Sequence, residues 1–340
     1  MTETAATPLR RPHRSGFAAR LLWLLAAGLL LCQATIWYRP VSPLLALLDE
    51  FAVQLTGLAL LGLAPALLLR RWRLAAVLAV LAATLSWPVL AHRSQAAVLA
   101  DGPRLTVLSL NVFEHATTHR LTLERLMASD ADIIGLVELT PAWKRDLAPL
   151  IAKYPYHVDC VGSELRCEHM LLSKLPIAKP YAGQVWHSQL YLAAGEIMWD
   201  GRPVMVIAAH LVWPLLRLED RDHAQDATPP WYLPGLPPIQ QVSEAASLAR
   251  FLNTLPPDVI LMGDMNGVPW GRVQRAFRGK AGLDNAAGWV FSWPSYLPWP
   301  LRLPIDHVLT RGHPAVASFA TGPKTDSDHL PVVAEIGWRE

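Results

Sequence analysis

The first hundred positions contain three long runs of apolar residues without any charged side chain. They cover residues 21–38, 51–69 and 74–91, and each approaches the roughly 20 residues that a helix needs to cross a bilayer. Proline within the last two runs does not exclude helices, because membrane helices tolerate it. We therefore expect three transmembrane helices. A two-span hairpin is the alternative, and a signal peptide would explain only the first run.

The distribution of charge divides the chain at the same place. Residues 1–100 hold nine Lys or Arg and three Asp or Glu, whereas residues 101–340 hold 21 basic and 25 acidic side chains. The first part is dominated by Leu and Ala, and the second has the mixed composition of a soluble domain. We predict a membrane anchor over residues 1–100, followed by a soluble domain over residues 101–340.

Arginines at the ends of the apolar runs predict the orientation of the anchor. They precede the first run and fill the short turn between the second and third: Arg10, Arg11, Arg14, Arg20, Arg70, Arg71 and Arg73. Basic flanks stay on the cytoplasmic side of a membrane. The N-terminus is then expected in the cytoplasm of a bacterial-type cell. Three crossings of the inner membrane would place the soluble domain in the periplasm.

Cys160 and Cys167 are the only cysteines in the soluble part. An even pair in an oxidising compartment favours a disulfide, with two free thiols as the alternative. The pair alone is not a zinc pattern, because a structural zinc ion needs about four ligands.

Short apolar runs in the soluble part predict a layered α/β domain. Strand-like runs recur at residues 105–110, 133–139, 170–172, 204–209, 259–262, 307–309 and 332–336. Helical patterns are expected at residues 121–128 and 242–252, the second with Ser243 as its N-cap. Because continuous apolar strands are typical of sheets covered on both faces, we expect sheets packed between other layers.

Polar residues stand at or just after the end of four of these strand-like runs: Asn111, Glu138, His210, Asp264 and Asn266. A single Asn or Asp in that place often only begins a turn. Several buried strands that end in this way can bring their polar groups into one cleft. We therefore predict a functional site where these strands end.

Six short segments carry these residues in one order: LSLNVF, IIGLVEL, VIAAHL, LMGDMNGVPW, PIDHVL and SDHLPVVAEI. The order resembles the endonuclease/exonuclease/phosphatase superfamily, which includes apurinic endonucleases, sphingomyelinases and inositol polyphosphate 5-phosphatases. The resemblance covers about residues 105–336. It implies a four-layer α/β sandwich, in which two packed β-sheets are flanked by helices. Here three transmembrane α-helices would precede the sandwich, as in membrane-anchored bacterial members.

The resemblance implies a metal site. Hydrolysis of an anionic phosphate ester needs a cation to neutralise charge and a group that activates water. Glu138, Asn111 and Asp328 are the predicted metal ligands. Carboxylate and amide oxygens suit Mg²⁺ or Mn²⁺.

The remaining matched residues are predicted to act on water and on the phosphate. Asp264 would position or deprotonate the attacking water, and Asn266 would hydrogen-bond the phosphate. His210 and His329 would stabilise negative charge in the transition state. Asp306 would hold His329 in the required tautomer.

The sequence also departs from the family pattern. Phe113 stands where many nucleases of the family have an acidic residue, and no convincing match exists for the mid-chain tyrosine of the apurinic endonucleases. The soluble part is net acidic and has no Lys/Arg cluster, unlike most nucleic-acid binders. We therefore favour a phosphodiester in a lipid or small molecule as the substrate. The alternative is a nuclease, and a non-catalytic interaction protein on the same fold is a third possibility.

Residues 211–241 form a proline-rich segment that includes Trp213, Trp231 and Tyr232. Segments of this length and composition are usually functional or disordered. Their aromatic side chains are expected to enter the bilayer or to wall a lipid pocket, with a packed surface loop as the alternative.

Overall fold

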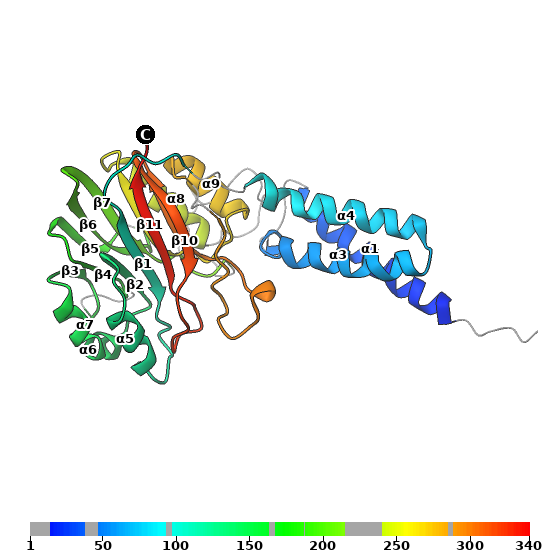
Figure 1. The fold of residues 1–340 in the computed structure, drawn as a ribbon, viewed down its shortest axis with the longest axis horizontal. Coiled ribbons are helices and arrows are strands. Elements are labelled where there is room, and N and C mark those ends of the chain that lie inside the picture. Colours follow the sequence, from blue (N-terminus) through cyan, green and yellow to red (C-terminus); the bar gives the residue numbers. More distant parts are fainter. Residues whose placement is uncertain are drawn as a thin grey trace, which may run out of the picture.

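The computed structural model describes residues 14–37, 47–92, 97–162, 167–186, 188–214, 240–284 and 288–340. A helical bundle forms one end of the molecule, and two β-sheets with helices on their outer faces form the other (Figure 1). Most of the proline-rich segment 211–241, with Trp231 and Tyr232, lies outside the described residues. So do Arg10 and Arg11.

The bundle contains α1 (Arg14–Trp37), α3 (Ala52–Leu68) and α4 (Trp72–Ala91), with the 3-10 turn η1 (Leu47–Asp49) before α3. Apolar side chains pack between the helices, and many leucines face outward. Among the described residues, only α1 and α4 are long and apolar enough to cross a membrane. The prediction of three such helices is wrong by this measure. The 51–69 run does form a helix, but its end residues are caps and the helix has 17 residues.

The first sheet has six strands in the order β10-β11-β1-β2-β4-β3. Its members are β1 (Leu105–Asn111), β2 (Ile133–Val137), β3 (Tyr156–Asp159), β4 (Met170–Ser173), β10 (Pro314–Thr321) and β11 (Val332–Trp338). β1 and β2 run parallel, and every other neighbouring pair is antiparallel. The parallel pair of this sheet, β1 and β2, therefore ends at Asn111 and Val137.

The second sheet has five strands in the order β5-β6-β7-β8-β9. Its members are β5 (Ile177–Gln184), β6 (Tyr191–Trp199), β7 (Arg202–Ala209), β8 (Val259–Asp264) and β9 (Asp306–Arg311). β7 and β8 are its parallel pair. This pair ends at Ala209 and Asp264, so both sheets present a parallel pair whose last residues adjoin predicted site residues.

Three apolar clusters build the four layers, which confirms the predicted packing of two sheets between helices. One cluster lies between the sheets, where residues such as Val107, Ile133 and Met262 are fully buried. A second joins the first sheet to α5 (Arg120–Met127), α6 (Pro141–Asp146) and α7 (Ala148–Lys153). The third joins the second sheet to α8 (Gln240–Asn253) and α9 (Arg272–Ala281).

Several elements differ from the expectation. Ser243 lies inside α8 and does not cap it, because the helix already includes Gln240. The strands β3, β5, β6 and β10 and the helices α6, α7 and α9 had no predicted counterpart. β5 shows why: it is an edge strand with the sequence IAKPYAGQ, and most of its residues are exposed. Such a strand lacks the continuous apolar run of a central strand.

Cys160 and Cys167 form a disulfide in the structure, as favoured from the sequence. It closes the segment between β3 and β4, next to the first sheet.

Polar contacts join the segment just before α3 of the helical bundle to the sandwich. The Asp49 carboxylate accepts hydrogen bonds from Arg272 (Nε to Oδ2, 2.6 Å), and both side chains are almost fully buried. The Glu50 carboxylate accepts a hydrogen bond from the Val268 amide at 2.6 Å, and the Trp270 indole donates to the Asp49 carbonyl oxygen. The segment that follows β8 is thus held directly by the turn before α3.

Candidate active site

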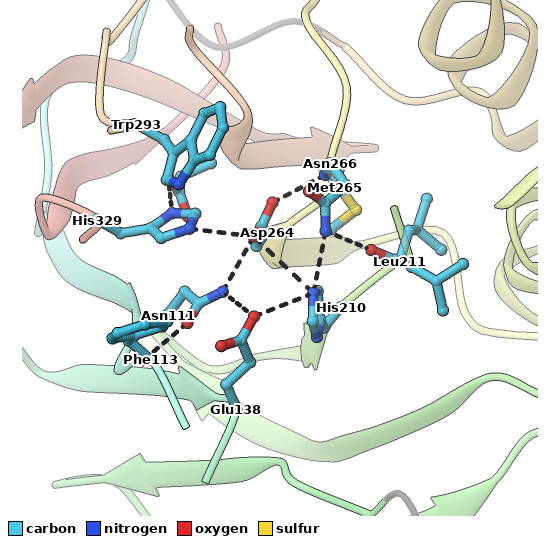
Figure 2. A network of polar contacts seen from close by, with 12 residues as sticks. Asn111, Phe113, Glu138, His210, Leu211, Asp264, Met265, Asn266, Trp293 and His329 are labelled. Carbon is cyan, nitrogen blue, oxygen red and sulfur yellow. Dashed lines mark hydrogen bonds and ion pairs between the residues drawn. The ribbon is translucent and has the colours of Figure 1, made fainter. Parts of the chain in front are cut away.

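The two parallel strand pairs bring most of the predicted residues into one cluster (Figure 2). Asn111 ends β1 and Glu138 follows β2 in the first sheet. His210 follows β7 and Asp264 ends β8 in the second sheet. Because the sheets face each other, these four side chains approach one another across the interface, as the dashed contacts in Figure 2 show.

Glu138 is the most accessible carboxylate of this central group. It has a positive φ of 59°, a left-handed conformation that turns the chain sharply after β2. Its Oε1 accepts a hydrogen bond from Asn111 Nδ2 at 2.6 Å and lies 3.7 Å from His210 Nε2. The side chain is 17% exposed, whereas that of Asp264 is 1% exposed. An ion could therefore reach Glu138 from solvent.

Asp264 lies at the centre of the cluster. Its Oδ2 accepts from Asn111 Nδ2 at 3.1 Å and lies 3.6 Å from His329 Nε2. Its Oδ1 accepts from the Asn266 amide at 2.8 Å. Burial raises the pKa of Asp264 to about 6, although the two neighbouring imidazoles, His329 and His210, act in the opposite direction. This carboxyl group can therefore exchange a proton near neutral pH.

Asn266 is held beside the cluster by two contacts. Its Nδ2 donates to the Leu211 carbonyl oxygen at 2.8 Å and lies 3.1 Å from His210 Nε2. Its φ is 46°, so the chain is not extended between Asp264 and Asn266. A tight turn brings them together instead, because the Asn266 amide folds back onto the Asp264 carboxylate.

His329 is paired with Asp306 as predicted. The ring Nδ1 lies 2.8 Å from Asp306 Oδ2, and the Ser292 hydroxyl donates to that same oxygen at 2.5 Å. Burial alone would lower the pKa of His329, but the carboxylates of Asp306 and Asp264 outweigh burial and raise its pKa to about 10. The imidazole is therefore a cation at neutral pH, with Nε2 directed toward Asp264.

Two predicted metal ligands are oriented differently from expectation. Asn111 donates its amino group to the carboxylates, and its oxygen accepts from the Phe113 amide at 2.9 Å. Asp328 Oδ2 accepts a hydrogen bond from the Trp293 indole at 3.0 Å. Its Oδ1 lies 4.0 Å from His329 Nε2. In this arrangement the Asn111 oxygen is engaged by the Phe113 amide, whereas Asp328 Oδ1 has no hydrogen-bond partner among the described residues and is available to an ion.

Two groups of three side chains have ligand atoms within 4.8 Å of one another at this site. One is Glu138, His210 and Asp264, and the other is Asp264, Asp306 and His329. The first is partly open and contains two carboxylates, which fit a hard divalent cation. The second already holds a protonated imidazole, which disfavours a cation there.

Two contributors to the site had no counterpart among the sequence predictions. Ser292 bonds Asp306 and Trp293 bonds Asp328, and both come from a segment between α9 and β9 that carries no regular apolar pattern. Trp213, which was expected to enter the bilayer or to wall a lipid pocket, lies with its ring centroid 5.3 Å from that of Trp293. No spacing in the sequence relates Trp293 to the distant Asp328.

The comparisons with known proteins agree with this fold. A family model described as "Endonuclease/Exonuclease/phosphatase family" matches residues 108–329, and no curated protein sequence matches the chain. A family protein of this type from Bacteroides thetaiotaomicron is 14% identical, with a TM-score of 0.53 over 71% of this chain and 100% of the other.

Two structures of TDP2 from D. rerio are also similar. A humanized form with 14 mutations is 16% identical, with a TM-score of 0.52 over 69% of this chain and 99% of the other. A complex with a single-strand DNA product is 15% identical, with a TM-score of 0.50 over 69% and 100%. At these identities the solved structures show a shared fold alone. The family match spans most of the chain, from β1 to the SDH segment, and this chain belongs to the endonuclease/exonuclease/phosphatase family.

Proposed function

We propose that this chain is a membrane-anchored, divalent-metal-dependent phosphoesterase that acts on a phosphodiester in a lipid or small molecule. The observation that carries the proposal is the convergence of Glu138 and Asp264 with the imidazoles of His210 and His329. Paired carboxylates for a cation, beside a cationic imidazole, are what hydrolysis of an anionic ester requires.

Each residue has a role that its contacts support. Glu138 would hold Mg²⁺ or Mn²⁺, which supplies charge neutralisation at the phosphate when bound, with Asp264 and His210 beside it. Asp264 accepts a proton from water or orients it, because its pKa is near neutrality. His329 donates a hydrogen bond from Nε2 to the phosphate, and Asp306 keeps its ring in place.

Asn266 Nδ2 lies 3.1 Å from His210 Nε2, which accepts its hydrogen bond, and both side chains are proposed to turn and donate to the phosphate oxygens when the substrate binds. Asn111 positions the two carboxylates through its amino group. We keep Asn111 and Asp328 as proposed ligands that turn toward the ion, or toward its water, when it binds.

The substrate preference rests on charge and on the anchor. The soluble part has four more acidic than basic side chains, so it lacks the overall attraction that phosphate backbones supply to nucleic-acid binders. The apolar helices α1 and α4 support anchoring in a membrane. Both features favour a substrate at a membrane over a nucleic acid.

A nuclease is the alternative function. Its support is the fold shared with TDP2, which has been captured with a single-strand DNA product. A substrate panel separates the two functions: DNA, RNA, phospholipids and inositol phosphates, each with Mg²⁺ or Mn²⁺. Cleavage of nucleic acid in preference to every other ester would establish the alternative.

The proposal is tested by Glu138→Gln, which keeps the shape of the side chain and removes its charge. We expect turnover to fall by more than about a hundredfold, the upper range for residues that only support metal ligands. EDTA should inactivate the wild type, and Mg²⁺ or Mn²⁺ should restore it. Glu124→Gln on the exposed face of α5 is the matched control and should keep full activity. Undiminished activity in EDTA would rule out the mechanism.

A further inference from the structure

An uncharged loop joins the active site to the membrane anchor. Residues 292–301 read SWPSYLPWPL and contain no charged side chain. The loop includes the 3-10 turn η3 (Trp299–Leu301) and lies between α9 and β9. It is the orange loop that lies beside the sandwich-facing end of the helical bundle in Figure 1.

One end of this 292–301 loop contacts the catalytic cluster. The Ser292 hydroxyl bonds the Asp306 carboxylate, and the Trp293 indole bonds the Asp328 carboxylate. The Ser295 hydroxyl donates to the Ser327 carbonyl oxygen at 2.9 Å. The loop therefore forms part of the wall around the segment that carries His329.

The other end of the loop is fixed to the anchor. Gln54, in the first turn of α3, donates to the carbonyl oxygens of Pro300 and Arg302 at 3.2 and 3.1 Å. Arg302 folds the loop by donating to the carbonyl oxygens of Leu297 and Ser295. These bonds hold the η3 turn at the level where α3 begins.

That level coincides with the bilayer surface expected for the anchor. Trp37 ends α1 and Trp87 lies in the last turns of α4, and both are more than half exposed. Exposed tryptophans at the ends of membrane helices mark the boundary between lipid tails and headgroups. The ends of α1 and α4 and the start of α3 all face the sandwich, so this boundary passes beside the η3 turn.

The loop presents apolar side chains at this boundary. Tyr296, Trp299 and Leu301 are 69%, 64% and 53% exposed, between exposed prolines. Adjacent exposed apolar side chains with no charge among them are typical of a surface that contacts a membrane. The membrane that this surface would contact is the bilayer spanned by the anchor, because the anchor helices hold the surface next to that bilayer.

From these contacts we infer that the 292–301 loop inserts its apolar tip into the bilayer that holds the anchor. The active site thereby takes a phospholipid from that same bilayer. This inference rests on the proposed function and narrows its substrate to a membrane-resident phosphodiester. The loop delivers the lipid phosphate to the cluster, because its inner end holds Asp306 and Asp328 while its tip occupies the headgroup region.

The test uses the full-length protein in vesicles of phosphatidylethanolamine, phosphatidylglycerol and cardiolipin with Mg²⁺. Release of lipid headgroups and hydrolysis of the soluble diester bis(p-nitrophenyl) phosphate are measured on the same vesicles. The double variant Trp299→Ser/Leu301→Ser should lose about tenfold of its lipid hydrolysis and keep soluble-ester hydrolysis within about twofold. The control is Trp186→Ser, a tryptophan after β5 that is 49% exposed, and it should leave both rates unchanged.

A second measurement does not depend on turnover. In a Cys32→Ala background, Tyr296→Cys and Met198→Cys are each labelled with a polarity-sensitive dye; Met198 is exposed near the β6–β7 turn. The dye at position 296 should emit as in lipid and be quenched by spin-labelled lipid, and the dye at 198 should not. Equal, water-like emission at both positions would overturn the inference.

The two measurements separate the possible failures. If lipid and soluble ester fall together in the double variant, the loop is only a wall of the site and the inference is overturned. If the soluble ester is cleaved and no lipid is, the lipid substrate is overturned while the phosphoesterase stands. If the wild type cleaves nothing, the proposed function fails, and the dye alone decides whether the loop enters the bilayer.

Discussion

The chemistry of the site depends on how a few carboxylates are shared. Asp306 Oδ2 binds both the His329 ring and the Ser292 hydroxyl, while Asp264 Oδ2 lies between His329 and Asn111. The His329 imidazole thus lies between Asp306, which we propose orients the ring, and Asp264, which we propose takes part in the reaction. This separation of tasks predicts different consequences for the two aspartates.

Asp264→Asn and Asp306→Asn should therefore differ in how much activity they remove and in how they change its pH dependence. Asp264→Asn should lower kcat by about 10²–10⁴ with little change in KM, because the lost interaction belongs to the transition state. Asp306→Asn should lower kcat by a smaller factor. It should also move the loss of activity at high pH to lower pH, because Asp306 helps to raise the pKa of His329 to about 10.

The pH dependence of wild-type activity should reflect the same two groups, Asp264 and His329. Activity should fall as the pH drops through about 6, where Asp264 takes up a proton, and again as the pH rises through about 10, where His329 loses one. Asp200→Asn, in an exposed turn after β6, is the control and should leave the profile unchanged. Equal small effects from Asp264→Asn and Asp306→Asn would mean that the site lies elsewhere.

Some of these residues could be identified from the sequence and others could not. Glu138, His210 and Asp264 each follow a buried apolar run, so the end of a strand indicates where they lie. The orientation of Asp328 could not be predicted. It depends on Trp293, a partner 35 positions away in an irregular segment.

Central strands were predictable because they are continuous and apolar, whereas edge strands were not. β2 and β8 are buried along their whole length, and the predicted runs overlap them closely. β10 and β5 lie at the edges of their sheets, and neither is a continuous run of buried apolar residues. The general architecture could be predicted from the central strands and from the family resemblance. The edge strands could be assigned only from the structure.

β8 carries a glycine on which the position of Asp264 depends. Gly263 has a φ of +144°, and an added Cβ would overlap the Ala209 carbonyl oxygen on β7. Gly263→Ala should therefore destabilise the domain by more than about 3 kcal/mol and remove activity. Gly279→Ala, in an open position on α9, should instead stabilise it by about 0.5–1 kcal/mol. Urea unfolding of both variants checks the prediction, and similar midpoints for the two would contradict it.

The anchor and the sandwich act as one unit through two acidic residues with different charge states. Burial raises the pKa of Glu50 to about 8, so it is mostly protonated at pH 7. Burial also raises the pKa of Asp49, but the adjacent Arg272 opposes that shift and forms an ion pair with it. A cavity of about 160 Å³ lined by Trp87, Trp270 and neighbouring residues lies beside this pair, away from the catalytic cluster.

Asp49→Asn and Glu50→Gln separate these two contributions. Asp49→Asn leaves the Arg272 cation buried without its counter-ion and should cost about 3 kcal/mol. Glu50→Gln resembles the neutral acid that is already present and should cost much less. Thermal unfolding of the full-length protein at pH 7 measures both. Equal losses would show that the ion pair does not join the two parts.

The predicted orientation of the chain in a membrane decides on which side the proposed chemistry would take place. Seven arginines flank the predicted cytoplasmic ends of the apolar runs, and three crossings would leave the catalytic part outside. The disulfide between Cys160 and Cys167 is consistent with an oxidising compartment. Orientation therefore also determines which substrates the site can meet.

Reporters fused after Glu340 test this orientation. A reporter that fluoresces only in the cytoplasm should stay dark, and one that works only in the periplasm should be active. A thiol reagent applied to the unreduced protein should miss Cys160 and Cys167, because both are bonded. A bright cytoplasmic reporter would instead mean an even number of crossings, as in the two-span hairpin that the sequence allows. The catalytic part would then face cytoplasmic nucleic acid, and nuclease activity would become the better explanation of the site.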